Sequence, residues 1–555
     1  MGDSDVECRD LHTLNITDIC AFVNATGDCQ IDEGFINYNE FVYCQFSSHL
    51  VPLGVAILFI WWLFLFSGLA VTADDFFCPS LAVISRTLRL SHNIAGVTFL
   101  AFGNGAPDIF SAIAAIGSAK AGDAGLAIGA LFGAGVFVTT VVVGAIATVH
   151  PFDAMQRPFL RDVIFYLGAV FWAFWIMWKK EITTYEAVGF ILLYVFYVVV
   201  VIVGRLIYQR HRSTPLEGNS IQNTGVDSLS TSTALFADDE SSPLLRPEVP
   251  GPPIVEIEKE EVLRFGRPHH EQETGAKAFF MAINPIDTEG WSEMRFYGKV
   301  YEVFKCPLML LLKLTVPVVD EEEEDMKGWN RTLNSLQCFT GPTFAIFATD
   351  LAFNKLGGVF PVYGLVISIG GVLSIAVFCT SSADEPPKYH AGFAYLGFLV
   401  AVIWIYSMAN EIVNILQMFG IVFNISNAII GLTLLAWGNS IGDLIADLAM
   451  ARQGYPRMGI SACFGGPLFN LLLGIGIPFT IACIKNNGTY HLQVTLEEMF
   501  LAGGVAVSLI SSLLIVPLSK FHMSRGYGVY LLILYIAFLA IALLIEINVI
   551  KNINH

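Results

Sequence analysis

The stretch GVTFLAFGNGAPD at residues 96–108 returns as GLTLLAWGNSIGD at residues 431–443, and each copy lies inside a long apolar stretch. The copies end in matching aspartates, Asp108 and Asp443. A carboxylate at hydrocarbon depth costs about 2.5–3.5 kcal/mol on insertion scales, so two of them at matching places are hard to explain as packing. Paired interrupted segments in the two halves of a membrane protein are typical of a transporter with an ion site near the membrane midplane.

The composition predicts a protein embedded in a lipid bilayer. The 555 residues are 55% hydrophobic and 14% charged, whereas a soluble protein carries about 25% charged residues. The formal net charge of −18 argues against a nucleic-acid partner. Neither motif contains a histidine or cysteine that could act as base or nucleophile beside the aspartates, so the sequence predicts neither an enzyme nor a bound cofactor.

Two sets of five apolar stretches predict the membrane-spanning helices, because a spanning helix needs about 20 apolar residues. The motif lies on the second stretch of each set. The first set is 51–73, 92–117, 124–149, 159–178 and 184–207, and the second is 391–419, 426–450, 458–484, 497–518 and 527–549.

Lysine and arginine mark the inner side of the membrane. With the N-terminus outside, inner loops of the first half hold seven of them and outer loops three, and in the second half the numbers are five and two. Both halves obey the rule only if the second is inverted, which requires an even number of spans between them. We expect a hairpin of 333–352 and 359–380, because the third central stretch, 306–319, contains Lys313 and Pro317. The predicted fold is an all-α polytopic membrane protein with an inverted 5+5 transmembrane-helix repeat and an extra central helical hairpin.

Five segments follow from this pattern. Residues 1–50 form a cysteine-containing segment outside the membrane, and 51–208 form the first five-helix repeat. A polar loop at 209–305 is rich in Ser, Pro and acidic residues, and is expected to be largely disordered and regulatory. Residues 306–390 hold an amphipathic segment and the hairpin, and 391–550 form the second repeat. The loop at 209–305 is expected on the opposite side of the membrane from 1–50.

The first 50 residues predict an oxidising compartment. They hold four cysteines, which suggest two disulfides with three connectivities open. Two glycosylation sequons, at Asn15 and Asn24, also favour an oxidising compartment. The cysteines are Cys8, Cys20, Cys29 and Cys44.

The start of the central loop suggests a regulatory phosphosite. Ser213 follows Arg210 and Arg212, a pattern that basophilic kinases often prefer. A phosphate there would pair with those arginines and reorder the loop start. An unmodified linker serine is at least as good a reading, so a kinase partner stays open.

The motif residues form a hard-cation ligand set. On a helix, Asn104 and Asp108 are four residues apart and share a face, as do Asn439 and Asp443. Pro107 removes an amide donor and frees a carbonyl one turn back. Carboxylate, amide and carbonyl oxygens suit Ca²⁺, whose charge two aspartates neutralise. Breaks in both motif interiors are expected to line a cavity.

A second pair of elements follows on the next helix of each half: ALFGAGVF at 130–137 and ACFGGPLF at 462–469. Their small residues, including Gly133 and Gly466, can serve close helix packing or carbonyl coordination, and both readings stay open. Asn470 follows the second copy as a polar side chain in an apolar helix.

Two further acidic residues are weaker candidates. Asp447 lies one turn beyond Asp443 and either extends the ion pathway or is solvated at the inner mouth. We favour the mouth, because Arg452 is close in sequence. Glu411 is expected near the outer interface.

These motifs resemble the calcium/cation antiporter superfamily, and within it the group of mitochondrial sodium/calcium exchangers, which are also described as transporting lithium. The resemblance covers most of the chain from about residue 50 and implies alternating access. Departures from plasma-membrane exchangers, which typically carry glutamates where this chain has aspartates, leave the coupling ion open. Carried over by position, the cation ligands are Asn104, Asp108, Asn439, Ser440, Asp443 and Asn470, with backbone help near Pro107, Gly133 and Gly466.

The sequence thus predicts an antiporter that exchanges Ca²⁺ for Na⁺ or Li⁺. An H⁺/Ca²⁺ antiporter using the same carboxylates is the alternative, since apposed carboxylates can take up a proton. A cation channel is remote, because channels usually build their oxygen rings from several chains. The resemblance implies the mitochondrial inner membrane, with plasma membrane or endoplasmic reticulum as alternatives, and a homo-oligomer is compatible with the sequence.

Overall fold

The computed structural model describes most of the membrane part of the chain. Most of the predicted loop 209–305 lies outside the described residues, as do Asn15 and Ser213. Described are residues 8, 11, 18–30, 35–46, 49–88, 101–119, 123–212, 275–286, 291, 294–319, 328–349, 351–356, 360–383, 385–452 and 456–553.

The N-terminal segment and the first half are helical apart from two short strands, and η3 and η5 are π-helical. The elements are α1 (Ile19–Ala25), η2 (Gly27–Cys29), α2 (Tyr38–Cys44), α3 (Val51–Val71), η3 (Thr72–Phe77), α4 (Cys78–Thr87), α6 (Ala101–Gly117), α7 (Gly125–Phe137), η5 (Val138–Val142), α8 (Val143–Val149), β1 (Phe152–Asp153), α9 (Gln156–Lys179), β2 (Glu181–Thr183) and α10 (Thr184–Arg212).

The centre and the second half follow the same pattern, with a third π-helical segment, η8. The elements are α11 (Gly275–Ile283), α12 (Phe296–Thr315), α13 (Arg331–Ala348), η7 (Leu351–Phe353), β3 (Lys355–Leu356), β4 (Phe360–Pro361), α14 (Val362–Thr380), α15 (Ala391–Phe423), α16 (Asn427–Ile430), η8 (Gly431–Leu435), α17 (Ala436–Arg452), α18 (Pro456–Lys485), β5 (Thr489–His491), α19 (Leu496–Leu518), β6 (His522–Met523) and α20 (Arg525–Ile553).

Local sequence sets several helix ends. Ser426 begins α16 and Thr495 begins α19, each accepting a backbone N–H with its side-chain oxygen. Lys180 after α9 and Asn424 after α15 adopt left-handed conformations, with φ of 59° and 52°, and stop those helices.

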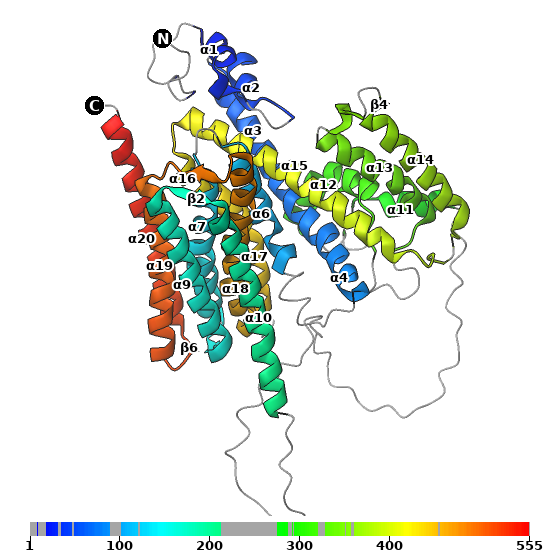
Figure 1. Ribbon diagram of the computed structural model, residues 1–555. Coiled ribbons are helices and arrows are strands. Elements are labelled where there is room, and N and C mark those ends of the chain that lie inside the picture. The colour runs from blue at the N-terminus through cyan, green and yellow to red at the C-terminus, as the bar shows by residue number, and fades with distance from the viewer. Residues whose placement is uncertain are drawn as a thin grey trace, which may run out of the picture.

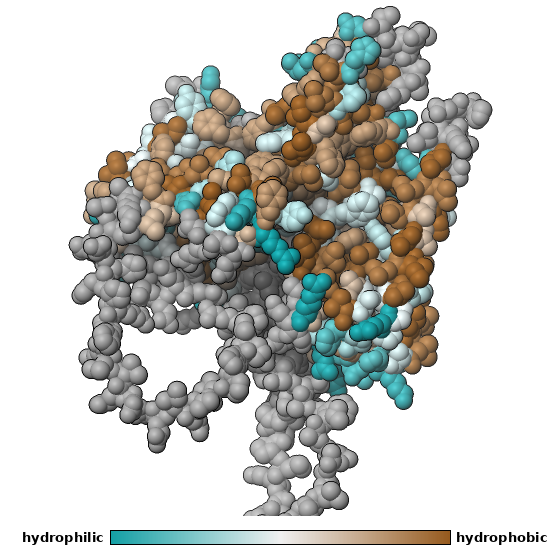
Figure 2. Space-filling view, turned by 180° about the vertical axis from the view of Figure 1, so that it is seen from behind, coloured by the Kyte–Doolittle hydropathy of each residue, from teal (hydrophilic) through white to brown (hydrophobic). Residues whose placement is uncertain are grey.

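Among the described residues, ten helical stretches are long and apolar enough to cross a membrane. Seen from behind, hydrophobic side chains cover most of the helical body (Figure 2). The predicted span 92–117 is described only as α6, since 89–100 lie outside the described residues. The ten stretches are Val51–Thr87, Gly125–Val149, Gln156–Lys179, Thr184–Gly204, Val362–Thr380, Ala391–Phe423, Asn427–Leu448, Gly459–Lys485, Leu496–Leu518 and Arg525–Ile547.

The first spanning helix is longer than the sequence suggested. We expected it to end at residue 73, before Asp74 and Asp75, but α3, η3 and α4 form one helix of 37 residues, Val51–Thr87. Asp75 is compensated by the positive charges of Lys305 and Lys313 from α12. These lysines belong to another element and are invisible in the local sequence around Asp75.

Two small sheets show that the halves are inverted. Strand β1 precedes α9 and pairs antiparallel with β6, which follows α19. Strand β2 follows α9 and pairs with β5, which precedes α19. The fourth helices of the two halves, α9 and α19, therefore run in opposite directions. Figure 1 shows the end of α20 on the same side as α1 and α2, whereas α10 reaches the opposite side.

The central hairpin is formed by α13 and α14. Trp329 and Arg331, where α13 begins, donate to the carbonyls of Ser382 and Phe378, where α14 ends. Strands β3 and β4 pair at the other end of the hairpin. By composition α14 counts among the ten candidate spans and α13 does not. The stretch we expected at 306–319 is the end of α12, which begins ten residues earlier, at Phe296.

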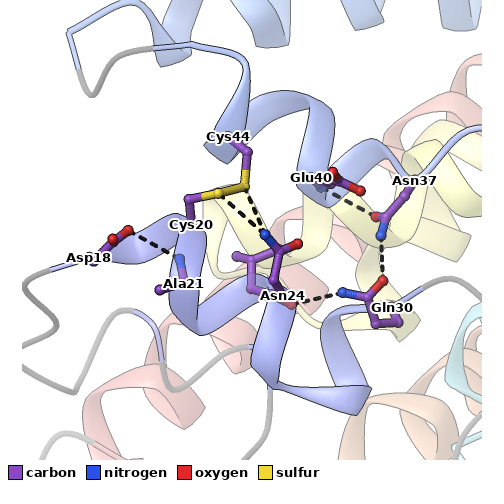
Figure 3. The surroundings of a disulfide bond; sticks show 9 residues. Asp18, Cys20, Ala21, Asn24, Gln30, Asn37, Glu40 and Cys44 are labelled. Atoms are coloured by element: carbon purple, nitrogen blue, oxygen red, sulfur yellow. Dashed lines mark hydrogen bonds between the residues drawn. A yellow bond between two sulfur atoms is a disulfide. The ribbon is translucent and has the colours of Figure 1, made fainter.

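The N-terminal segment is stapled by two disulfides, Cys8–Cys29 and Cys20–Cys44, which selects one of the three open connectivities. In Figure 3, Asn24 lies beside the second disulfide, and its amide donates to both sulfur atoms. The side chain of Asn24 is exposed, as a glycosylation acceptor requires.

This stapled segment docks on α15 through Glu411. The carboxylate of Glu411 is buried, and it accepts hydrogen bonds from the backbone N–H of Phe35 (2.6 Å) and from the hydroxyl of Tyr38. The indole N–H of Trp61 on α3 donates to the same hydroxyl at 3.2 Å. Burial raises the pKa of Tyr38 above its ordinary value, and the charge of Glu411 adds to this. The phenol therefore stays protonated and holds α2, α3 and α15 together.

We expect Glu411→Ala to loosen this docking, because it leaves the buried hydroxyl of Tyr38 and the backbone N–H of Phe35 without their acceptor, and an unpaired buried donor costs about 1–3 kcal/mol. Limited proteolysis should cut the first 50 residues faster in this variant than in wild type. Glu40→Ala, which removes an exposed carboxylate of α2, is the matched control. Equal cleavage rates in all three proteins would contradict the docking role.

Candidate functional site

The centre of the candidate site is Asp108 on α6. Its side chain is 7% exposed. One carboxylate oxygen accepts from the amide of Asn439 on α17 at 2.9 Å, and the other accepts from the amide of Asn470 on α18. The fold thus brings the two motif copies and the polar residue after the second FGG element to one point. Pro107, inside α6, removes a donor from the helix just before Asp108.

The amides of Asn439 and Asn470 each use their N–H groups on Asp108 and leave their oxygens free. Neither Oδ1 atom has a hydrogen-bond partner among the described residues, although both are buried. The hydroxyl of Ser440, next along α17, is fully buried and equally unpartnered. A buried polar oxygen without a partner costs about 1–3 kcal/mol. The two amide oxygens beside Asp108, with the Ser440 hydroxyl next along α17, form the oxygen-rich environment that a hard cation compensates.

Asp443 completes the set from one turn further along α17. Its charge interacts with that of Asp108, so the two motif aspartates lie close together. The carboxylate keeps part of its surface accessible and makes no hydrogen bond with the described residues. No group of three or more His, Cys, Asp or Glu side chains in the described ranges is placed to hold a metal. A cation here would therefore depend on amide, hydroxyl and backbone oxygens besides the two carboxylates.

The helix break expected inside the second motif is displaced. We expected an interruption at Ser440-Ile441-Gly442, but α17 is continuous from Ala436 to Arg452. The irregular part is the π-helical segment η8, which begins at Gly431. The break expected at Gly105-Ala106-Pro107 is absent too, because α6 is continuous from Ala101 to Gly117 with Pro107 inside it. The second motif contains no proline. Serine and glycine lower helix propensity without removing a backbone donor, so the helix persists.

Asp447 is not the solvated residue that we expected at the mouth. It is 5% exposed, and its Oδ2 accepts a hydrogen bond from the thiol of Cys463 on α18 at 3.3 Å. The closeness of Arg452 in sequence was misleading, because α18 packs along α17 and covers this face. Cys463 was not a sequence candidate, and only its position directly before Phe464 in ACFGGPLF could have drawn attention to it.

Three motif glycines differ in their role. A Cβ built at Gly133 would lie 2.8 Å from the Cα of Leu432, so close packing of α7 against η8 explains this glycine. A Cβ at Gly105 would lie 2.2 Å from Oδ1 of Asn470. A Cβ at Gly466 would meet nothing within 4 Å, and packing does not explain that glycine.

The element ALFGAGVF of the first half is not followed by a counterpart to Asn470. The two threonines that come after it form hydrogen bonds within their own helix. Thr139 and Thr140 donate to the carbonyls of Gly135 and Val136 in their own helix, as expected for helix threonines.

Tyr166 of α9 was missed by the sequence analysis. Its buried hydroxyl has no hydrogen-bond partner among the described residues, and it interacts electrostatically with Asp108. The side chain of Asn104 lies outside the described set.

A family model described as "Sodium/calcium exchanger protein" matches residues 58–203 and 393–544, more than half of the chain. The two matched stretches begin 335 residues apart, the same offset as the two motif copies. The match therefore follows the internal repeat.

Curated relatives extend over nearly the whole chain. A "Mitochondrial sodium/calcium exchanger protein" of Homo sapiens is 44% identical over 560 residues, covering 98% of this chain and 91% of the relative. The protein of the same name from Gallus gallus is 44% identical, covering 99% and 92%. A solved sodium-calcium exchanger, NCX_Mj, is 15% identical, with a TM-score of 0.36, and covers 87% of this chain and 98% of that one. With its family match and these two relatives, the chain belongs to the sodium/calcium exchanger protein family.

Proposed function

We propose that this protein is a secondary antiporter of a mitochondrial membrane that exchanges Ca²⁺ for Na⁺ or Li⁺ by alternating access. Cation/Ca²⁺ antiport is the activity for which its relatives are named. The two motif aspartates, Asp108 and Asp443, bind the divalent ion between the inverted halves. The monovalent ions use the same oxygens after Ca²⁺ has left.

One observation carries the proposal. The amides of Asn439 and Asn470 both turn their N–H groups to Asp108, which leaves two buried amide oxygens and the Ser440 hydroxyl without partners. A site built for a neutral or anionic ligand would use donors, whereas these free groups are oxygen acceptors. Soft ligands are absent from both motifs, so Ca²⁺, Na⁺ and Li⁺ fit better than copper or zinc.

Proton coupling is the second candidate. Asp108 and Asp443 interact electrostatically, and apposed carboxylates can hold a proton between them when the divalent ion leaves. In this alternative the same residues bind Ca²⁺, and only the counter-ion differs.

We expect Na⁺ or Li⁺, but not K⁺, to drive Ca²⁺ uptake into proteoliposomes that contain the purified protein. K⁺ is too large for a site whose helices approach as closely as α6 and α18 do at Gly105. The measurement compares imposed Na⁺, Li⁺, K⁺ and pH gradients, one at a time. Asn470→Ala should weaken uptake with both Na⁺ and Li⁺. Uptake driven by a pH gradient alone, with none from a Na⁺ gradient at constant pH, would replace the proposal by proton antiport.

A further inference from the structure

Asp74 is an exposed carboxylate inside the unbroken spanning helix Val51–Thr87. Charged side chains within spanning helices face a bundle interior or a water-filled cavity, because contact with lipid is too costly. The backbone at this point is the π-helical segment η3, and π-bulges occur frequently at functional sites. None of the ion-site motifs includes this residue.

The packing of α3 on α17 places Asp74 on the inner side of the candidate site. A Cβ built at Gly438 of α17 would lie 2.3 Å from the ring of Phe66 on α3, so the helices touch there. Both helices run inward from this contact. At about 1.5 Å per residue, Asp74 lies about 12 Å further in, and Asp443 and Asp447 lie about 7.5 and 13.5 Å further in. Asp74 and Asp447 are therefore at similar depth, one turn inward of Asp443.

The charges around these residues agree with that placement. Asp443 interacts electrostatically with Asp74 and Asp447 as well as with Asp108. The neighbouring Asp75 points to a different side of the helix and interacts with the positive charges of Lys305 and Lys313 on α12, whereas no lysine or arginine of the described chain acts on Asp74. The two adjacent aspartates thus have different electrostatic surroundings.

We propose that Asp74 is a cation-steering residue of the inner approach, which concentrates Ca²⁺ and its counter-ion in front of Asp443. This inference rests on the proposed cation transport. A carboxylate at the edge of a low-dielectric cleft raises the local concentration of cations and their rate of association. Asp447 lies at the same depth but is buried and hydrogen-bonded to Cys463, so Asp74 is the exposed carboxylate there.

The transport test is specific to one side of the membrane. In proteoliposomes of single orientation, Asp74→Asn should raise the half-saturating Ca²⁺ concentration on the inner side about tenfold at low ionic strength. The value on the outer side and the maximal rate should stay unchanged. Choline chloride, which is not a transport substrate, should shrink the inner-side difference, because salt screens exposed charges. Asp74→Glu should restore wild-type behaviour. Asp75→Asn is the matched control and should behave as wild type.

A second test needs no transport. Cys78, one turn inward of Asp74, is a free and partly exposed thiol that senses the charge of Asp74. In a background where the other accessible free cysteines, Cys306 and Cys379, are alanine, a cationic methanethiosulfonate should label Cys78 faster than an anionic one. That preference should fall about tenfold in Asp74→Asn and persist in Asp75→Asn.

The outcomes separate the two proposals. If wild-type protein moves no Ca²⁺ but the labelling preference follows Asp74, the transport proposal fails and the electrostatic role remains. If wild type transports Ca²⁺ while Asp74→Asn matches it on both sides and in labelling, the steering role is wrong. An equal rise of the half-saturating concentration on both sides would also contradict it, because a general structural defect has no side preference.

Discussion

Ca²⁺ exchange is expected to fall at least 100-fold when either Asp108 or Asp443 is replaced by asparagine. The substitution keeps the size and polarity of the side chain and removes one of the two charges that neutralise the ion. An under-neutralised divalent ion in a low-dielectric site costs several kcal/mol, and each 1.4 kcal/mol is a factor of ten. Because both charges act on one ion, the two single variants should be equally inactive.

The measurement is Na⁺-driven Ca²⁺ uptake in proteoliposomes with matched amounts of protein. Thermal unfolding in detergent checks that the variants fold. Asp153→Asn, which changes an exposed carboxylate next to β6, is the control and should transport normally. Wild-type uptake by either motif variant would show that its aspartate is not a ligand of the transported ion.

Gly105→Ala is expected to weaken Ca²⁺ transport about 10- to 100-fold. The added methyl group would lie 2.2 Å from Oδ1 of Asn470 and 2.7 Å from the ring of Phe469. Overpacking of this kind typically costs 1–3 kcal/mol. Since the Asn470 amide is the easier group to move, the methyl group should displace it from Asp108 and disturb the ligand oxygens.

The half-saturating Ca²⁺ concentration checks this second expectation. Gly168→Ala makes the same change on α9 at a position where a Cβ meets nothing within 4 Å, and it should leave transport unaltered. Normal transport by Gly105→Ala would mean that Asn470 can move without loss of function, and would argue against its role as a ligand.

The sequence alone predicted the internal repeat and the contact between the two motif copies. The lengths of the apolar stretches predicted the helices, and the offset between the motif copies predicted the two halves. The lysine and arginine counts in the loops predicted that the halves are inverted, and the pairing of β1 with β6 and of β2 with β5 confirms this. Nothing local foretold that Asn439 and Asn470 would both bond to Asp108, although their residue types suggested oxygen ligands.

Other features depend on neighbours that a single sequence does not reveal. Asp74 looked like the end of a helix, because the compensation of Asp75 comes from lysines more than 200 residues away. Asp447 looked solvated because Cys463, its partner, belongs to the next helix. The disulfide pairing was open for the same reason, since four cysteines in one segment carry no record of which pairs meet.

Calorimetric titration of Ca²⁺ into the purified protein tests the shared site most directly, because it measures binding without transport. We predict one saturable Ca²⁺ site per chain in wild type, weakened by Na⁺ or Li⁺ but not by K⁺, and absent in both Asp108→Asn and Asp443→Asn. Wild-type binding in either variant would contradict a single ion held between the two aspartates.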